Sequence, residues 1–156
     1  MAIEIRKAKP EDKELLVRWR LEVIDDIFGK YFTGLPKEEY DAIVNNTVKY
    51  YETQISSGNH YACFAYDGET PVACGGFVYY QELPSPDNLS GKCAYIMNIY
   101  TSFDYRQQRI GSRIVEYLID EAKALGAEKI YLETSVKGED MYRRLGFCSM
   151  NGYMML

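Results

Sequence analysis

Hydrophobic residues change from a two-residue spacing to a helical spacing along the first part of the chain. Residues 2–7 alternate apolar and charged side chains, which predicts a half-buried strand. Pro10 suits the first turn of a helix. After it, apolar residues recur at helical spacing: Leu15, Leu16, Trp19, Val23, Ile24 and Ile27. A second amphipathic helix is expected after Pro36, ending near residue 55.

The middle of the chain carries strand-like runs separated by turn residues. Residues 60–66 and 71–81 are predicted strands, and the Asp67–Gly68 pair between them is a strong hairpin signal. A fourth strand, 92–101, leads into a basic turn, and residues 110–125 beyond it form an amphipathic helix that a glycine ends. This order of elements predicts a mixed α/β fold.

The C-terminal part continues the same alternation. Residues 129–134 are a predicted strand, a short helix ends at Leu145, and a closing hairpin is expected over residues 147–156. No internal repeat or linker interrupts the pattern, so residues 1–156 are expected to form a single domain.

The turn between the strand 92–101 and the helix that follows has the composition of a phosphate site. The first backbone N–H groups of a helix have no intrahelical partner, and the helix dipole places partial positive charge there. Two arginines add full charges, and a glycine lets a ligand approach the backbone closely. The predicted binding residues are Arg106, Gln107, Gln108, Arg109, Ile110, Gly111 and Ser112.

A second motif, Met141–Phe147, ends the short helix about thirty residues later. Together, the basic turn and this Y-x-x-L-G-F motif resemble the GNAT superfamily, the Gcn5-related N-acetyltransferases. The resemblance implies a mixed, mostly antiparallel sheet of six to seven strands, splayed between the fourth and fifth and flanked by about four helices. In that family the turn reads R/Q-x-x-G-x-G/A, and Arg109 stands where its first glycine would be.

The resemblance also implies a cofactor and a reaction. Acetyl-CoA would lay its pantetheine arm along the fourth strand at Ile99, Tyr100 and Thr101, and a backbone N–H near Asn98–Ile99 would polarise the acetyl carbonyl. Tyr142, at the family's tyrosine position, would protonate the departing thiolate. The expected activity is acetyl transfer from acetyl-CoA to a primary amine of a small molecule or peptide, by direct attack on the thioester. The alternative is a non-catalytic module that binds or senses acyl-CoA.

The general base and the acceptor are not fixed by the sequence. Several GNAT enzymes carry a glutamate on the fourth strand where this chain has Tyr95. Other carboxylates remain possible bases: Glu22, Asp25, Asp26, Glu82 and Glu133. By the same resemblance, aromatic residues would surround the acceptor: Trp19, Phe28, Tyr31, Phe32, Tyr79 and Tyr80. Aromatic faces beside carboxylates favour a cationic amine.

Composition narrows the class of protein. A net charge of −5 argues against a nucleic-acid surface, and no apolar run reaches the length of a membrane span. The N-terminal residues show no basic-then-apolar leader, so a cytoplasmic protein without a membrane partner is expected. The four scattered cysteines predict buried free thiols, and the one histidine, His60, is expected at the surface rather than in a metal site. An apolar edge at Met154–Leu156 predicts a homodimer.

Overall fold

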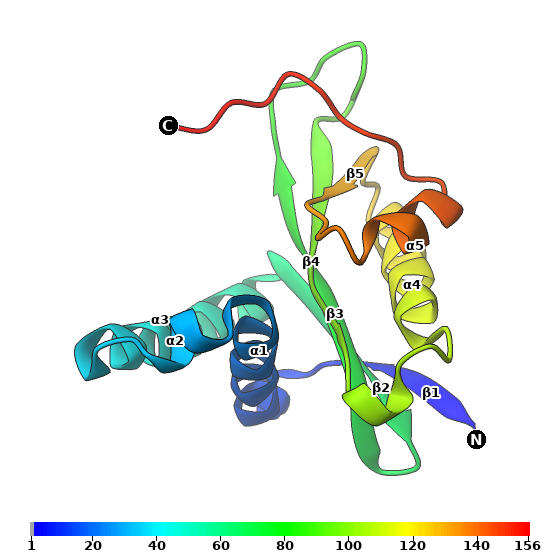
Figure 1. Cartoon of the computed structure of the whole chain (residues 1–156). Helices are drawn as coiled ribbons and strands as arrows, with labels where there is room; N and C mark the ends of the chain where they lie inside the picture. The colour runs from blue at the N-terminus through cyan, green and yellow to red at the C-terminus, as the bar shows by residue number, and fades with distance from the viewer. Residues whose placement is uncertain (1) are drawn as a thin grey trace.

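The computed structural model describes residues 2–156, and it contains one five-stranded mixed sheet (Figure 1). The strands lie in chain order: β1 (Ile3–Lys7), β2 (His60–Asp67), β3 (Thr70–Gln81), β4 (Lys92–Thr101) and β5 (Lys129–Leu132). The first three pairings are antiparallel, and β4 pairs with β5 in parallel. The β2–β3 hairpin follows from the Asp67–Gly68 turn, in which Gly68 has a φ of 60°.

Helices cover both faces of the sheet (Figure 1). The helices on one face are α1 (Lys13–Phe28), α2 (Lys30–Thr33) and α3 (Lys37–Ser57), and those on the other are α4 (Ile110–Ala124) and α5 (Glu139–Arg144). Short 3-10 turns, Pro10–Asp12 and Phe103–Tyr105, precede α1 and α4. No helix within residues 2–156 combines the length and the apolar character needed to cross a bilayer.

Each face of the sheet has its own core, because alternate strand residues point to opposite sides. On one face Trp19 of α1 packs edge-on against Phe64 of β2, with ring centroids 6.0 Å apart. On the other face the stripe of α4, including Ile114 and Leu118, packs against Phe77 of β3 and is fully buried. The two clusters hold α1 and α4 on opposite sides of β4.

A β-bulge interrupts the pairing of β3 with β4. Gly76 pairs with Met97 and Cys74 pairs with Tyr100, so one residue of β3 opposes Asn98 and Ile99 of β4. Asn98 has a φ of 61°, a left-handed conformation that Asn tolerates better than most residues. Its backbone carbonyl accepts a hydrogen bond from Sγ of Cys74 at 3.4 Å.

The pairing of β4 with β5 ends next to this bulge. Within the described part of the chain, the parallel ladder joins Cys93–Ile96 of β4 to Lys129–Leu132 of β5 and does not continue past the bulge. The last residues of β4 therefore have an edge that β5 does not pair. The expected splay between the fourth and fifth strands corresponds to this short ladder.

The prediction of a closing hairpin over residues 147–156 is wrong, and with it the expected six to seven strands. That segment is irregular in the structure and crosses one end of the sheet beside β5 without pairing with it (Figure 1). An apolar run predicts a strand only where a neighbouring edge pairs with it, yet Met154 and Met155 are almost fully exposed. The helix count also differs, since α2 makes five helices. Cys148 is exposed rather than buried, because it lies in this irregular segment.

Candidate active site

The turn before α4 leaves backbone N–H groups without an intrahelical partner. The first intrahelical bond runs from the N–H of Arg113 to the carbonyl of Arg109 at 3.1 Å, and no side chain of residues 2–156 caps the helix. The N–H groups of residues 110–112 thus precede the hydrogen-bond ladder. Gln107 and Arg109 both adopt left-handed φ angles, 62° and 61°. The turn is shaped without the family's first glycine, at the expense of backbone strain in Arg109.

Arg106 does not point into this turn. Its Nε donates to the carbonyl of Thr101 at 3.0 Å, and its Nη2 pairs with Asp26 of α1 at 2.9 Å. The hydrogen bond and charge of that carboxylate raise the pKa of Arg106 above its ordinary value. The guanidinium also lies 5.5 Å from the ring centre of Tyr100. Arg106 therefore ties the turn to α1, and Arg109 is the arginine left facing the solvent beside the helix start.

Gly111 lies where β4, α4 and α5 meet. A Cβ atom built on it would come within 3.5 Å of Sδ of Met141 and 3.6 Å of Oγ1 of Thr101, which are ordinary contacts. Ile110 beside it is buried in the core under α4. The predicted strand residues and the predicted helix start are thus brought together with the helix that carries Tyr142.

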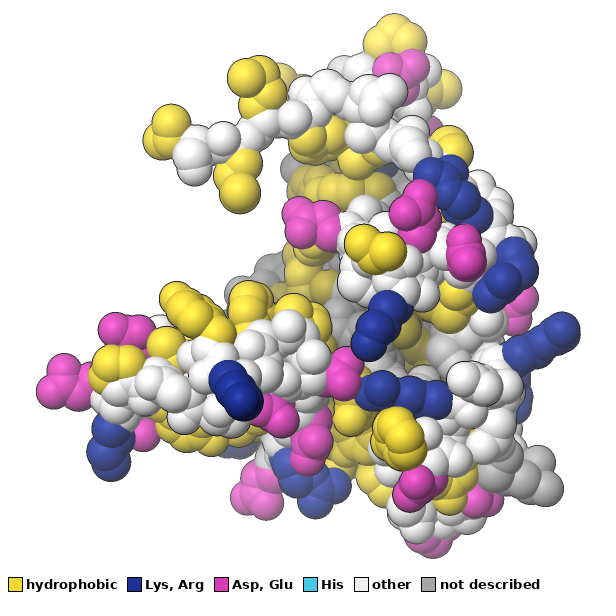
Figure 2. Space-filling model, in the orientation of Figure 1, with side chains coloured by type: hydrophobic (Ala, Val, Ile, Leu, Met, Phe, Trp, Pro, Cys, Tyr) yellow, Lys and Arg dark blue, Asp and Glu magenta, His cyan; other side chains and the backbone are white. Residues whose placement is uncertain are grey.

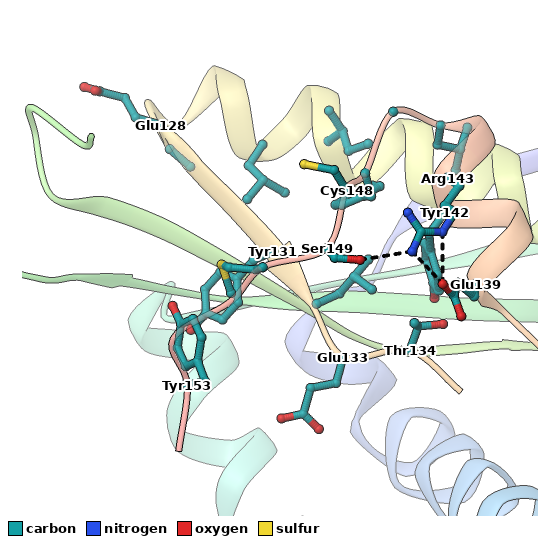
Figure 3. A pocket seen from close by; sticks show the side chains of 18 of the residues that line it. Glu128, Tyr131, Glu133, Thr134, Glu139, Tyr142, Arg143, Cys148, Ser149 and Tyr153 are labelled. Carbon is teal, nitrogen blue, oxygen red and sulfur yellow. Dashed lines mark hydrogen bonds and ion pairs between the residues drawn. The ribbon is translucent and has the colours of Figure 1, made fainter. Parts of the chain in front are cut away.

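Tyr142 lies on α5 at the rim of a cavity of about 730 Å³ (Figure 3). Its ring packs edge-on against Phe147, with centroids 5.8 Å apart. Burial raises the pKa of Tyr142 to about 12, so its hydroxyl stays protonated at neutral pH and can donate a proton or hydrogen bond. Glu139 and Thr134 line the same cavity, and Arg143 beside Tyr142 is held by Glu139 at 2.6 Å and by Ser149 at 3.0 Å.

The fold agrees with the comparison to known proteins. Residues 21–147 match the model of the acetyltransferase (GNAT) family. The chain belongs to this family.

Solved structures of GNAT proteins superpose over almost the whole chain. A "predicted acetyltransferase" from Clostridium acetobutylicum, crystallised with acetyl-CoA, has a TM-score of 0.86 at 24% identity and covers 99% of this chain and 96% of its own. A GCN5-related N-acetyltransferase from Ralstonia eutropha has a TM-score of 0.83 at 20% identity, covering 99% and 98%. At these identities the likeness shows the shared fold.

One curated relative matches a shorter segment. Glucosamine 6-phosphate N-acetyltransferase from Arabidopsis thaliana is 30% identical over 56 residues, which is 36% of this chain and 38% of the relative. The matched segment therefore spans well under half of that protein.

A second cavity of about 500 Å³ in this GNAT protein lies between α1, α3 and the bulge of β4. Its walls are mainly apolar and aromatic, and it is lined by Arg20, Ile24, Ala42, Ile43, Asn46, Thr47, Tyr50, Tyr51, His60, Val78, Met97 and Asn98. Figure 2 shows a hollow between helices α1–α3 and the part formed by α5 and the C-terminal tail, with hydrophobic side chains along the helical edge.

His60 is buried, so its expected surface position is wrong. It is 5% exposed at the start of β2, and Nδ1 shares a hydrogen bond of 2.8 Å with the hydroxyl of Tyr50. Burial, followed by the charge of Arg20, lowers the pKa of His60 to about 4, which leaves the ring neutral at physiological pH. Gly76 makes room for the ring, since an added Cβ would lie 2.8 Å from Nε2. A lone histidine between Asn59 and an apolar strand gives no sequence signal that its ring is buried and hydrogen-bonded.

The predicted acceptor aromatics do not gather in one place. Trp19 and Phe32 are buried, whereas Phe28 and Tyr31 are largely exposed. Tyr79 and Tyr80 are neighbours on β3 and point to opposite faces of the sheet. The hydroxyl of Tyr79 donates to the carbonyl of Leu125 at 2.9 Å, and that of Tyr80 lies 2.6 Å from the hydroxyl of Tyr131.

The five candidate bases are placed in three ways. Asp26 pairs with Arg106, and Glu82 pairs with Lys129 at 3.3 Å, whose hydrogen bond lowers the pKa of Glu82. Glu133 lines the larger cavity at the end of β5. The remaining two, Glu22 and Asp25, are exposed on α1. Across residues 2–156, no three His, Cys, Asp or Glu side chains gather as a metal site would require.

Proposed function

We propose that this protein transfers the acetyl group of acetyl-CoA to a primary amine by direct attack on the thioester. The observation that carries the proposal is the continuity between two features. The unpaired edge of β4 after the bulge leads, through the turn of residues 102–109, to the uncapped helix start, where Gly111 leaves the backbone accessible. A pantetheine arm with peptide-like amides suits the first, and a pyrophosphate suits the second.

Different residues are assigned to the two parts of acetyl-CoA. Ile99, Tyr100 and Thr101 offer backbone groups to the pantetheine amides. The turn from Gln107 to Ser112 offers N–H groups to the pyrophosphate, and Arg109 adds positive charge. Arg106 acts on the turn through Asp26, so it positions the site rather than contacting phosphate. The relative from Clostridium acetobutylicum, solved with acetyl-CoA, supports this cofactor.

The chemical step needs a proton donor for the leaving thiolate and an acceptor for the proton that the amine loses. The amine nitrogen attacks the carbonyl carbon, the carbon–sulfur bond breaks, and the sulfur leaves as a thiolate. Backbone N–H groups at the bulge stabilise the oxyanion that forms in between. Tyr142 protonates the thiolate and regains a proton from water, while the amine loses its proton to solvent. The apolar walls of the cavity beside the bulge disfavour an ammonium ion, which helps the amine to react as the neutral species.

A test combines turnover with a matched pair of variants. Thiol release from acetyl-CoA is measured with a panel of amines for the parent, Tyr142→Phe and Tyr153→Phe. Tyr153 lines the same cavity from the C-terminal tail, so it controls for loss of a hydroxyl there. Loss of a general acid costs on the order of a hundredfold in rate, so Tyr142→Phe should show that decrease with unchanged affinity for acetyl-CoA. A Tyr142→Phe variant as active as the parent would remove this residue from the mechanism.

The alternative function is a module that binds or senses acyl-CoA without turnover. The strained Arg109 in place of a glycine and the absence of a carboxylate at the position of Tyr95 favour it. Tight binding of acetyl-CoA without thiol release for any amine would support the module. A cytoplasmic location and a homodimer remain predictions from the sequence.

A further inference from the structure

The cavity beside the bulge carries one charged side chain, that of Arg20. None of its other lining residues, all within the described part of the chain, is acidic. Arg20 extends from α1 and is half-buried, and its Nη1 donates to Oδ1 of Asn98 at 3.0 Å. The cavity that opens on the bulge is therefore apolar with a single positive group next to the expected position of the acetyl carbonyl.

Arg20 has spare hydrogen-bonding capacity. A guanidinium has five N–H donors, and the structure records one hydrogen bond from this side chain. Within residues 2–156, no carboxylate lies within 4 Å of it, although other arginines such as Arg6, Arg106 and Arg143 each have an acidic partner. A half-buried charge without a counter-charge is unfavourable, and a ligand that supplies one gains the corresponding free energy.

We propose that the acceptor is a small primary amine that carries an anionic group and an apolar body, with Arg20 pairing with the anion. The proposal rests on the acetyltransferase function given above. A carboxylate or a phosphate monoester provides two oxygens that match the planar fork of a guanidinium. The apolar body of the acceptor would contact Ile24 and Ile43 on the facing sides of α1 and α3.

Charge complementarity selects against the cationic amine that the sequence suggested. The acidic residues Glu22, Asp25 and Asp26 do not line this cavity, and Asp26 is occupied by Arg106. A polyamine would bring a second positive charge towards Arg20. His60 adds no second positive charge because its ring is neutral. An acceptor with an anion compensates Arg20 and leaves its amine free to face the bulge.

The test compares amines that differ by one group. Steady-state kcat/KM is measured with saturating acetyl-CoA for phenylalanine and 2-phenylethylamine, which differ by a carboxylate. β-Alanine, O-phosphorylethanolamine and ethanolamine then separate carboxylate from phosphate. The variants are Arg20→Met, which removes the charge, and Arg18→Met, which removes an equal charge from an exposed position on the same helix.

We expect the parent to have a kcat/KM on the order of tenfold to a hundredfold higher for the anionic member of each pair, because hydrogen bonds to charged groups contribute about that much. Arg20→Met should reduce that ratio to about one, mainly through the anionic substrate. Arg18→Met should keep the parent's ratio. If Arg20 only holds Asn98 in place, Arg20→Met would slow both substrates equally and leave the ratio intact, which would overturn the inference.

A binding experiment keeps the inference testable apart from turnover. Phenylalanine and 2-phenylethylamine are titrated into the parent protein while the side-chain amide signal of Asn98 is followed by NMR. A perturbation by phenylalanine at concentrations where 2-phenylethylamine gives none supports the anion site. Equal binding or equal turnover of the two amines overturns the inference and leaves the acetyltransferase function standing. Absence of turnover with every amine contradicts the proposed function instead.

Discussion

Replacing Arg109 by glycine should make the protein more stable, because Arg109 occupies a left-handed conformation with a φ of 61°. That conformation costs a residue with a Cβ atom about 1–2 kcal/mol, and glycine avoids this cost. Glycine also raises the conformational entropy of the unfolded chain, which lowers the stability of the folded state by about 0.4–1 kcal/mol. The change also removes a positive charge from the positive end of the α4 dipole, worth about 0.3–1 kcal/mol. The net expectation is a gain of about 1 kcal/mol in the free energy of unfolding.

The assay is chemical denaturation at 25 °C with thermal unfolding alongside it. For a chain of this size a gain of about 1 kcal/mol raises Tm by about 2–4 °C. Gln107→Gly is the matched control: its φ is 62°, it lies in the same turn, and it carries no charge. The free energy of unfolding should increase slightly less in Gln107→Gly than in Arg109→Gly. A loss of stability in Arg109→Gly would refute the strain argument and indicate that Arg109 makes a stabilising contact.

The same two variants separate conformation from charge in binding. Affinity for acetyl-CoA should fall in Arg109→Gly if its charge contributes to phosphate binding, and it should be nearly unchanged in Gln107→Gly. Equal affinity in both variants and the parent would remove Arg109 from the binding residues.

Three further predictions follow from other parts of the molecule. Gly111→Val should fold, since its Cβ meets Met141 and Thr101 at ordinary distances, but calorimetry should show weaker CoA binding; unchanged affinity would count against the assigned site. His60 is neutral in the folded state with a pKa of about 4, whereas the unfolded chain takes up the proton near 6.5. Stability should therefore be constant above pH 6.5 and fall by about 3 kcal/mol towards pH 4, and His60→Gln should flatten the denaturation profile across that window. The exposed apolar tail predicts a dimer by light scattering, and a mass equal to one chain at all concentrations would contradict it.

Local patterns in the sequence predicted most of the elements. The spacing of apolar residues predicted α4 from Ile110 with an error of one residue at its end, and the strand Lys92–Thr101 with correct bounds. These elements are set by which face is buried, and periodicity reports that directly. The predicted strand at residues 129–134 is two residues shorter in the structure, ending at Leu132.

Long-range pairings could not be predicted in this way. Arg106 was expected at a phosphate, yet it pairs with Asp26, which lies 80 residues earlier in the chain. Arg20 and Asn98 are 78 residues apart, and their hydrogen bond holds the positive charge of Arg20 at the second cavity. The bulge at Asn98 depends on one backbone angle and leaves no pattern in the neighbouring side chains. The closing hairpin failed for a related reason, because an apolar run does not reveal whether a strand edge will pair with it.

The central claim is that acetyl-CoA binds along the end of β4 and across the start of α4. It is tested most directly by titrating acetyl-CoA into the isotopically labelled full chain and following the backbone amide signals by NMR. The largest changes are expected on Ile99, Tyr100 and Thr101 and on the turn from Gln107 to Ser112. Saturating acetyl-CoA that leaves these amides unperturbed, or that perturbs only residues remote from them, would contradict it.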